Sequence, residues 1–299
     1  MIKPHPPTEP PQIVNEPRPA FPEQKQASPG IEAELTPRPR YLASNYKAAG
    51  KLEGKVALVT GGDSGVGRAV CVLYAREGAD VCFTYLPQEQ VDALETFRAV
   101  EAEGHRCLML TGNLADPTFC RQVVERTVHE FGHLDILVSN AAHQNRKQSL
   151  DEITDEEWQR TFAVNMDAYF YLCQAAVPHM KPGSAIIATS SVVSLEGEGS
   201  LVDYGATKGA INAFTKCLAK MLIDKGIRVN AVALGPVWTP LNPADEGTTP
   251  QQIAHFGESA LYGRPAQPEE VAPMYVFLAS EADSSYITGA ILDETGGRG

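Results

Sequence analysis

The sequence predicts an α/β fold: a single-domain, doubly wound parallel sheet of about seven strands with helices on both faces. From residue 55 onward, short apolar runs alternate with longer stretches of helical periodicity. The runs are continuously apolar, which is typical of parallel strands buried on both faces. A glycine-rich turn joins the first run to the first helical stretch. These observations favour a Rossmann-type architecture, in which ligands bind outside the carboxyl ends of the strands.

Seven strands are expected at runs of mostly apolar residues, namely 56–60, 81–85, 107–110, 134–139, 185–190, 227–233 and 290–294. Helices are expected between them at 65–77, 90–103, 117–131, 155–176 and 204–224, and after residue 268. Asp116 precedes Pro117 as a cap with proline at the first helical position. Thr154 and Glu157 have the spacing of a capping box. Pro273 should interrupt or bend the last helix.

Composition narrows the class of protein. The 299 residues suffice for one large domain or two small ones, and the net charge of −12 argues against nucleic acid or an anionic membrane surface as partner. No run of 18 apolar residues could span a membrane, and the N-terminus lacks the apolar segment of a secretory signal. The six cysteines form no CxxC pair. We therefore expect reduced thiols, no metal site and a cytoplasmic location.

The first 50 residues differ from the rest of the chain. Eleven of the 22 prolines lie within the first 40 residues, together with many Glu, Gln and Lys. Residues 1–50 should therefore form an extended, polyproline-like or disordered N-terminal arm, with the catalytic domain at 51–299. Two interpretations remain open. The arm is either solvated or laid over a neighbouring subunit through the anchors Ile31, Leu35, Tyr41, Leu42 and Tyr46.

The stretch from 185 to 208 contains the residues best suited to proton transfer. Ser191 ends the fifth strand, and Tyr204 and Lys208 share one face of the following helix because they are four positions apart. A nearby cation lowers the pKa of a phenol from its usual value of about 10. Such a Tyr can exchange a proton with a carbonyl/alcohol pair, while the Ser hydroxyl binds the same oxygen. A packed ring and a solvated amine would show the same spacing, so other parts of the chain must decide.

The turn after the first strand has the composition of a phosphate-binding loop. It runs from Thr60 to Gly67, with glycines at Gly61, Gly65 and Gly67. Glycines allow the backbone to approach a pyrophosphate closely, and the helix that follows offers free N–H groups. A plain tight turn is the alternative. The position between a strand and a helix favours dinucleotide binding.

These two motifs carry a family resemblance. The TGxxxGxG spacing from Thr60 to Gly67 and the YxxxK spacing from Tyr204 to Lys208 resemble the short-chain dehydrogenase/reductase family over residues 52 to 297. The GGDSG wording and the proline-rich leader resemble its glucose/ribitol dehydrogenase-like or bacterial aldehyde reductase-like subgroup. The resemblance implies an NAD(P)-dependent oxidoreductase that transfers a hydride between nicotinamide and a small carbonyl/alcohol substrate. It also implies a homo-oligomer, expected to be a tetramer.

The resemblance places the family's catalytic tetrad on Asn165, Ser191, Tyr204 and Lys208. The thirteen-residue spacing to Tyr204 favours Ser191 over Ser190. Lys208 would lower the pKa of Tyr204 and hold the nicotinamide ribose, and Asn165 would hold a water that joins Lys208 to solvent.

The cofactor-binding residues implied by the resemblance are Gly61, Asp63, Ser64, Gly65, Val66, Gly67, Tyr85, Asn113, Leu114, Asn140, Ala141, Tyr204, Lys208, Gly235, Val237 and Thr239. Ala142 stands where the family has Gly, and Leu234 stands where it has Pro.

Cofactor choice depends on charge at the end of the second strand. Residues 84–87 contain neither the carboxylate that grips a 2′-hydroxyl nor the Arg that accepts a 2′-phosphate. Ser64 stands where NADP-preferring relatives often carry a base. Asp63 and Glu89 would repel a phosphate, which Arg68 could offset. The expectation is a weak preference for NAD, with NADP as the alternative.

The substrate side is expected at residues 240–265, a stretch rich in Pro, Gly and Thr that should form a lid. Five polar residues could face the pocket or serve only as loop residues: His143, Gln144, Glu196, Glu198 and His255. Their polarity suits sugars or polyols, whereas Trp238 and Leu241 would suit a small aldehyde or ketone. A non-catalytic dinucleotide sensor or scaffold is the competing hypothesis, and the complete set of Ser191, Tyr204 and Lys208 argues against it.

Overall fold

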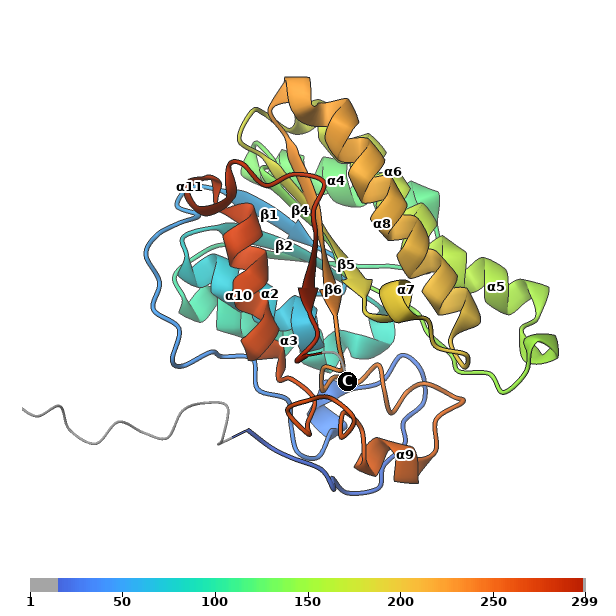
Figure 1. Cartoon of the computed structure of the whole chain (residues 1–299). Coiled ribbons are helices and arrows are strands. Elements are labelled where there is room, and N and C mark those ends of the chain that lie inside the picture. Colours follow the sequence, from blue (N-terminus) through green and yellow to red (C-terminus); the bar gives the residue numbers. More distant parts are fainter. Residues whose placement is uncertain (1–15, 298–299) are drawn as a thin grey trace, which may run out of the picture.

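The computed structural model describes residues 16–297, and within them a parallel sheet confirms the predicted architecture (Figure 1). Its strands run in the order β3-β2-β1-β4-β5-β6-β7, and every neighbouring pair is parallel. The order reverses between β1 and β4, where this architecture opens its ligand crevice. The strands are β1 Val56–Val59, β2 Asp80–Tyr85, β3 Cys107–Thr111, β4 Ile136–Ser139, β5 Ala185–Ser191, β6 Arg228–Leu234 and β7 Ile291–Glu294.

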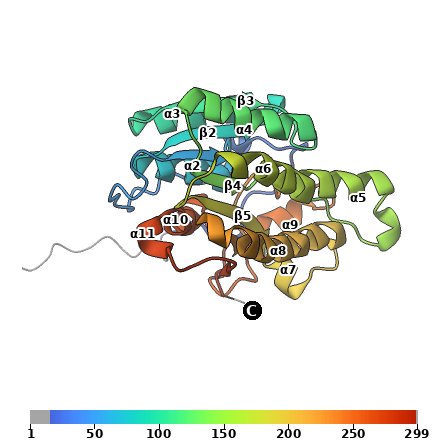
Figure 2. The same cartoon turned by 90° about the horizontal axis from the view of Figure 1, so that it is seen from above.

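Helices cover both faces of the sheet (Figures 1 and 2). One face carries α2 Gly65–Arg76, α3 Gln90–Ala102 and α10 Pro268–Ala279, and the other carries α4 Pro117–Phe131, α6 Ala168–Ala176 and α8 Val202–Leu222. Successive residues of a strand point to opposite faces. Ala57 and Val59 of β1 therefore pack with the first group of helices, and Val56 and Leu58 with the second.

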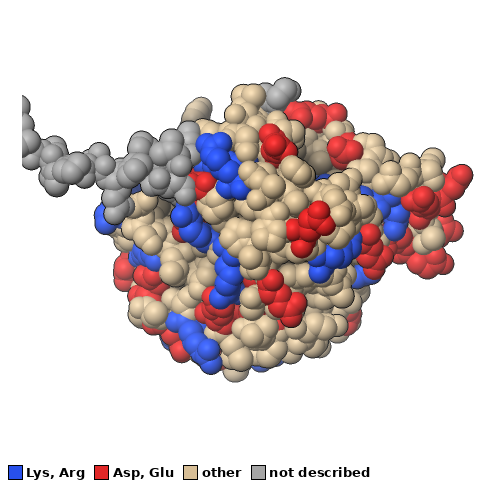
Figure 3. All heavy atoms as spheres, turned by 90° about the horizontal axis from the view of Figure 1, so that it is seen from below, with Lys and Arg blue, Asp and Glu red and all other residues tan. Residues whose placement is uncertain are grey.

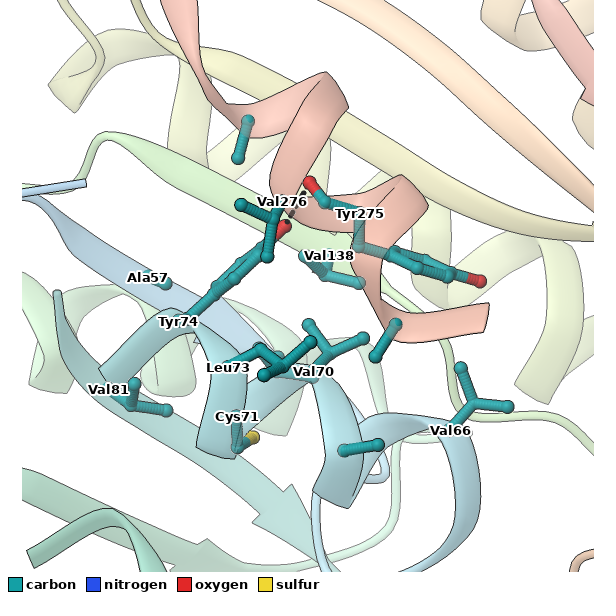
Figure 4. Packing of buried hydrophobic residues seen from close by; sticks show 14 of the residues in the cluster. Ala57, Val66, Val70, Cys71, Leu73, Tyr74, Val81, Val138, Tyr275 and Val276 are labelled. Carbon is teal, nitrogen blue, oxygen red and sulfur yellow. Dashed lines mark hydrogen bonds between the residues drawn. The ribbon is translucent and has the colours of Figure 1, made fainter. Parts of the chain in front are cut away.

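Helix α10 is anchored to α2 across the first face. The Tyr74 hydroxyl donates a hydrogen bond of 3.0 Å to the carbonyl of Tyr275, and both side chains are fully buried among Val70, Val138 and Val276 (Figure 4). The helix continues through Pro273 rather than being interrupted there. This packing places the start of α10 near the carboxyl ends of the strands.

The long helix expected at 155–176 is divided into α5 Asp155–Phe162, the π-helical turn η4 Ala163–Asp167, and α6. Sequence analysis did not predict the short helices α7 Val193–Glu196, α9 Pro250–Ala254 and α11 Glu281–Ser284. Five 3₁₀ turns complete the described elements: η1 Glu32–Glu34, η2 Pro87–Glu89, η3 Leu150–Glu152, η5 Val177–His179 and η6 Ile223–Lys225.

The described part of the N-terminal arm, residues 16–50, packs against its own chain, beside α9 and below the carboxyl ends of the strands (Figure 1). Leu35 is only 2% exposed, and the ring of Phe21 lies 4.4 Å from that of Trp238. The Trp238 Nε1–H donates to the carbonyl of Pro37 at 2.8 Å. The described part of the arm is therefore packed on its own chain rather than solvated, and its contact with a neighbouring subunit stays a prediction. Residues 1–15 lie outside the described residues.

Acidic and basic side chains are interspersed on the face that contains the arm (Figure 3). None of the helices described between residues 16 and 297 has the length and apolar character needed to cross a membrane. The same residues contain no cluster of three or more His, Cys, Asp or Glu that could hold a metal ion. The cysteines are free thiols, and Cys71, Cys82, Cys120 and Cys173 are buried.

Candidate active site

A cavity of about 560 Å³ opens at the carboxyl ends of the strands. Most of the predicted site residues line it: Gly61, Asp63, Ser64, Gly65, Val66, Tyr85, Asn113, Leu114, Asn140, Ala141, Ser191, Tyr204, Lys208, Gly235, Val237 and Thr239. Asn165 and Gly67 are not among the lining residues. Both nevertheless support the cavity wall, as their contacts show.

Ser191 and Tyr204 meet in this cavity. Ser191 ends β5, Tyr204 lies in the first turn of α8, and both side chains line the cavity, where the Ser191 hydroxyl favours the ionised form of the phenol. The neighbouring Ser190 hydroxyl instead donates to Asn212 Oδ1 on α8 at 2.6 Å. The geometry therefore agrees with the spacing argument that favoured Ser191.

The electrostatics around Tyr204 differ from the expectation. Burial raises the pKa of Tyr204 to about 12, opposed by the Ser191 hydroxyl and the charge of Arg146. Burial also lowers the pKa of Lys208 to about 7. The Lys208 ammonium lies 5.3 Å from the centre of the Tyr204 ring and donates to the carbonyl of Thr189 at 2.7 Å. Lys208 is not among the groups that lower the pKa of Tyr204, and desolvation of the phenol sets the direction of the shift, contrary to expectation.

Asn165 lies in the π-helical turn η4 and is almost fully buried. Its Oδ1 accepts a hydrogen bond from the His143 N–H at 2.7 Å, and its Nδ2 donates to the His143 carbonyl at 2.9 Å and to Thr207 Oγ1 at 3.1 Å. The π turn is a single-turn bulge of a kind often found at functional sites. Here it connects the loop after β4 to α8.

The glycine loop has no room for side chains at its tightest point. A Cβ atom on Gly67 would lie 1.9 Å from the carbonyl oxygen of Gly61. Asn140 braces the same loop, because its Nδ2 donates to the carbonyls of Thr60 and Gly61 at 3.1 and 3.3 Å. Its Oδ1 accepts from Thr189 Oγ1 at 3.1 Å. The lack of side chains at this turn fits close approach by a pyrophosphate, while the N–H of Gly65 is bonded to the Glu32 carboxylate.

Two carboxyl groups lie near this loop and the end of β2, namely the buried Asp63 and the half-buried Glu89 of η2. Burial raises the pKa of Asp63 to about 6 and that of Glu89 to about 8, and the charge of Asp63 adds to the effect on Glu89. Asp63 Oδ2 has no hydrogen-bond partner within residues 16–297. Arg68, which the sequence offered as a counter-charge, is fully buried and pairs with Glu32 of the arm at 2.6 Å. It is therefore withdrawn from the cavity.

The ends of β2 and β3 complete this side. The Tyr85 hydroxyl donates to Gln90 Oε1 at 2.7 Å. Asn113 Oδ1 accepts from the Ala115 N–H at 2.9 Å, and this turn presents Leu114 to the cavity. These contacts place apolar and amide groups where the resemblance expects the adenine.

The loop after β6 is held by backbone contacts. Gly235 donates its N–H to the carbonyl of Glu294 at 3.0 Å, and a Cβ atom there would lie 2.5 Å from the Thr295 carbonyl oxygen. Val237 forms a bridge with Ala266, and Thr239 lines the cavity. The replacement of Pro by Leu234 leaves this loop against the cavity, as the resemblance expected.

On the substrate side, some of the residues expected to face the pocket line the cavity and others do not. His143, Gln144 and Glu198 line the cavity, whereas Glu196 and His255 do not. Trp238, expected to face a substrate, is wholly buried beneath the arm.

Sequence reasoning missed several lining residues, three of which come from the arm and from the loop after β4. Ser28 and Pro29 come from the arm, and Arg146 comes from the loop after β4. Arg146 Nη1 lies 2.6 Å from Asp245 Oδ2. No periodic pattern or motif could have identified these residues, since each reaches the site through non-local packing.

Comparison with known proteins agrees with this geometry. Residues 61–298 match the family model described as enoyl-(acyl carrier protein) reductase. The chain is 50% identical over 286 residues to general stress protein 39 of Bacillus subtilis (strain 168), covering 95% of this chain and 98% of that protein. It is 46% identical over 285 residues to glucose and ribitol dehydrogenase of Daucus carota, covering 93% and 96%.

Among solved structures, a short chain dehydrogenase from Burkholderia cenocepacia J2315 in complex with NADP is similar, with a TM-score of 0.76 and 33% identity over 83% of this chain and 98% of that chain. The family-model match over residues 61–298 includes the glycine loop from Gly61 onward, Ser191 and Tyr204. The chain is therefore an NAD(P)-dependent oxidoreductase that belongs to the short-chain dehydrogenase/reductase family.

Proposed function

We propose that this protein interconverts a carbonyl and an alcohol, with Tyr204 as the proton donor and acceptor. The observation that supports this role most directly is that Ser191 and Tyr204 line the same cavity, with the Ser191 hydroxyl acting to lower the pKa of the phenol. Both hydroxyls can contact one substrate oxygen, which Ser191 orients while Tyr204 transfers the proton. When bound, the nicotinamide supplies or accepts the hydride.

The protonation of Tyr204 favours reduction at neutral pH. Because burial raises its pKa to about 12, the phenol keeps its proton and is ready to donate it to a carbonyl oxygen. Oxidation of an alcohol needs the phenolate, which the buried site disfavours. Lys208, directed at the Thr189 carbonyl, lies on the side of the ring where we propose that the nicotinamide ribose binds.

NAD is the proposed cofactor, although the Burkholderia cenocepacia relative was solved with NADP. A 2′-phosphate near the end of β2 would face Asp63 and Glu89. Burial disfavours the ionised form of both groups, and the charge of Asp63 adds to the effect on Glu89. The guanidinium of Arg68 is engaged by Glu32 and cannot compensate. An unpaired carboxylate oxygen such as Asp63 Oδ2 is instead a suitable acceptor for a ribose hydroxyl.

The substrate class that best fits the lining is a hydroxylated carbonyl compound or polyol. His143, Gln144, Arg146 and Glu198 supply donors and acceptors around the open end of the cavity. The apolar contact expected from Trp238 is lost to the arm. The name of the Daucus carota relative, glucose and ribitol dehydrogenase, points the same way. Residues 240–265, which include α9, are the proposed lid over this region.

We further propose that the protein is a cytoplasmic homotetramer. The support is the family resemblance, together with large apolar side chains that remain exposed on α5, α6 and α8, such as Trp158, Phe170 and Met221. Size-exclusion chromatography with light scattering tests the subunit number, and a monomeric mass would contradict the proposal.

A substrate panel with both nicotinamide cofactors tests the function. Sugars, polyols, small aldehydes and ketones are followed by the absorbance of the reduced nicotinamide. The expected result is turnover with hydroxylated substrates and a lower KM for NAD(H) than for NADP(H). Binding of the cofactor without turnover of any compound would contradict the enzymatic proposal and favour the sensor hypothesis.

A further inference from the structure

The described part of the arm contacts both walls of the cavity. Glu32 reaches the glycine loop, and Lys25 reaches the proposed lid. Between these two residues, Ser28 and Pro29 line the cavity itself. The arm therefore forms a third wall next to the glycine loop and the lid.

Glu32 is held at the first residue of α2. Its side chain is fully buried, and Oε2 accepts the N–H of Gly65 at 2.6 Å. Oε1 accepts from Arg68 Nη1, also at 2.6 Å. The first N–H groups of a helix have no partner within the helix, and its positive end favours an anion. Glu32 therefore stabilises the helix start that directly follows the glycine loop.

Arg68, the partner of Glu32, also forms hydrogen bonds to the backbone of the glycine loop. Its Nε donates to the carbonyl of Asp63 at 2.8 Å, and Nη2 donates to the carbonyl of Asp92 at 3.1 Å. Asp92 in turn accepts the N–H groups of Glu32 and Ala33 at 2.6 and 3.0 Å, which holds the arm against α3. The loop is thus tied to the arm directly at Gly65 and indirectly at Asp63.

Lys25 fixes the other wall. Its Nζ donates to the carbonyls of Asp245 and Glu246 at 2.6 and 3.1 Å, and also to the carbonyl of Thr248. The N–H of Gln26 donates to the carbonyl of Pro243 at 3.0 Å.

Gly30 passes so close to the same wall that a Cβ atom on it would lie 2.7 Å from the Pro240 carbonyl oxygen. Because the Lys25 ammonium donates to the carbonyls of three lid residues at once, it holds this stretch of the lid in a single arrangement.

We propose that the arm acts on the cofactor site of its own chain, with Glu32 as a positioning residue for the glycine loop and Lys25 as the residue that fixes the lid. The proposal rests on the proposed function in one respect, that the cavity binds a nicotinamide dinucleotide. It predicts that substitutions at the two ends of the arm have different effects. Loss of Glu32 should weaken cofactor binding, and loss of Lys25 should loosen the lid.

The first experiment measures the Kd for NADH by fluorescence titration, which needs no turnover. Glu32→Ala should raise the Kd by about 10- to 100-fold, since displacement of a binding group by about 1 Å costs up to that factor. Glu32→Gln keeps an acceptor for the Gly65 N–H and should recover part of the affinity. The control is Glu34→Ala, which removes an exposed carboxylate from the same 3₁₀ turn. In Glu32→Gln, kcat at saturating cofactor should stay within about threefold of wild type.

Equal affinity in Glu32→Ala and Glu34→Ala would overturn the role of Glu32. A wild-type protein that binds NADH and shows no turnover would instead contradict the proposed function and leave this comparison valid. If Glu32→Ala does not fold, the test uses the milder Glu32→Gln instead. A Kd for NADH equal to that of wild type in Glu32→Gln, together with an unchanged kcat at saturating cofactor, would overturn the proposal.

Hydrogen exchange tests the lid. In Lys25→Met, amide protection at residues 244–248 should fall, while the Kd for NADH stays near that of wild type. Unchanged protection there would overturn the role of Lys25.

Co-expression of differently tagged Glu32→Ala and Gly67→Ala chains tests whether the arm acts within one chain. Purification through both tags should yield oligomers that contain both variants and bind NADH as weakly as either variant alone, or should yield no mixed oligomers. Recovery of wild-type sites would show that the arm acts across subunits, which contradicts the proposal.

Discussion

Replacing Gly67 by Ala should distort the glycine loop and weaken its binding of the proposed dinucleotide. The added Cβ would lie 1.9 Å from the carbonyl oxygen of Gly61 and 2.8 Å from Asn140 Nδ2. Ordinary van der Waals contact begins at 3.4 Å, so the two backbone segments must move apart by about 1.5 Å. The backbone of Gly67 does not have a positive φ, so steric overlap alone causes this shift.

A displacement of this size should weaken NADH binding by about 100-fold, equivalent to about 2.7 kcal/mol. Overpacking should also lower the free energy of unfolding by about 1–3 kcal/mol. Fluorescence titration gives the Kd, and chemical denaturation gives the stability.

Gly209→Ala is the matched control. Gly209 lies in α8 with no atom within 4 Å of an added Cβ, so this substitution should leave binding unchanged. If Gly67→Ala bound NADH as tightly as the control, the close approach of the loop to the dinucleotide would be refuted.

Three further predictions concern the titrating groups. Tyr204→Phe should lower turnover by about 10²- to 10⁴-fold with little change in the Kd for NADH, whereas Tyr286→Phe, at a fully exposed tyrosine, should be neutral; near-normal turnover in Tyr204→Phe would refute the proton-transfer role. The ratio of the KM for NADP to the KM for NAD should decrease as the pH falls from about 8 to about 6, because Glu89 and then Asp63 become protonated and lose their charge. A ratio that does not change with pH would contradict the role of these two carboxylates in discrimination against NADP. Burial lowers the pKa of Lys208 from 10.5 to about 7, so the folded state binds fewer protons than the unfolded state between these values. The free energy of unfolding of wild type should therefore rise relative to Lys208→Met as the pH increases from about 7 to about 10, and parallel curves from denaturant titrations would refute that pKa.

Local signals explain why much of the fold could be predicted. The strands and helices follow from apolar runs and caps that act within a few residues. Asp116 accepts the N–H of Thr118 at 2.8 Å, and Thr154 accepts that of Glu157 at 3.2 Å, as helix caps should. Because polar residues at strand ends share one edge of a parallel sheet, the candidate site followed from the same pattern.

The parts that sequence reasoning missed depend on contacts between distant residues. Glu32 meets Arg68 and Asp92, which are 36 and 60 positions away, and no local pattern marks this pairing. The pKa of Tyr204 was assigned the wrong direction for a related reason. Helical spacing places Lys208 on the same face, yet desolvation by the surrounding fold decides the sign, and spacing alone cannot report it.

The π-helical turn at Ala163–Asp167 has a consequence for how this segment can vary in length. A π bulge is in effect one residue inserted into a regular helix, and one residue corresponds to a rotation of about 100° around the axis. Deleting any single residue there would turn α6 relative to α5. Asn165 could then no longer contact both His143 and Thr207. Substitutions in this turn should consequently be tolerated more readily than a change of its residue number.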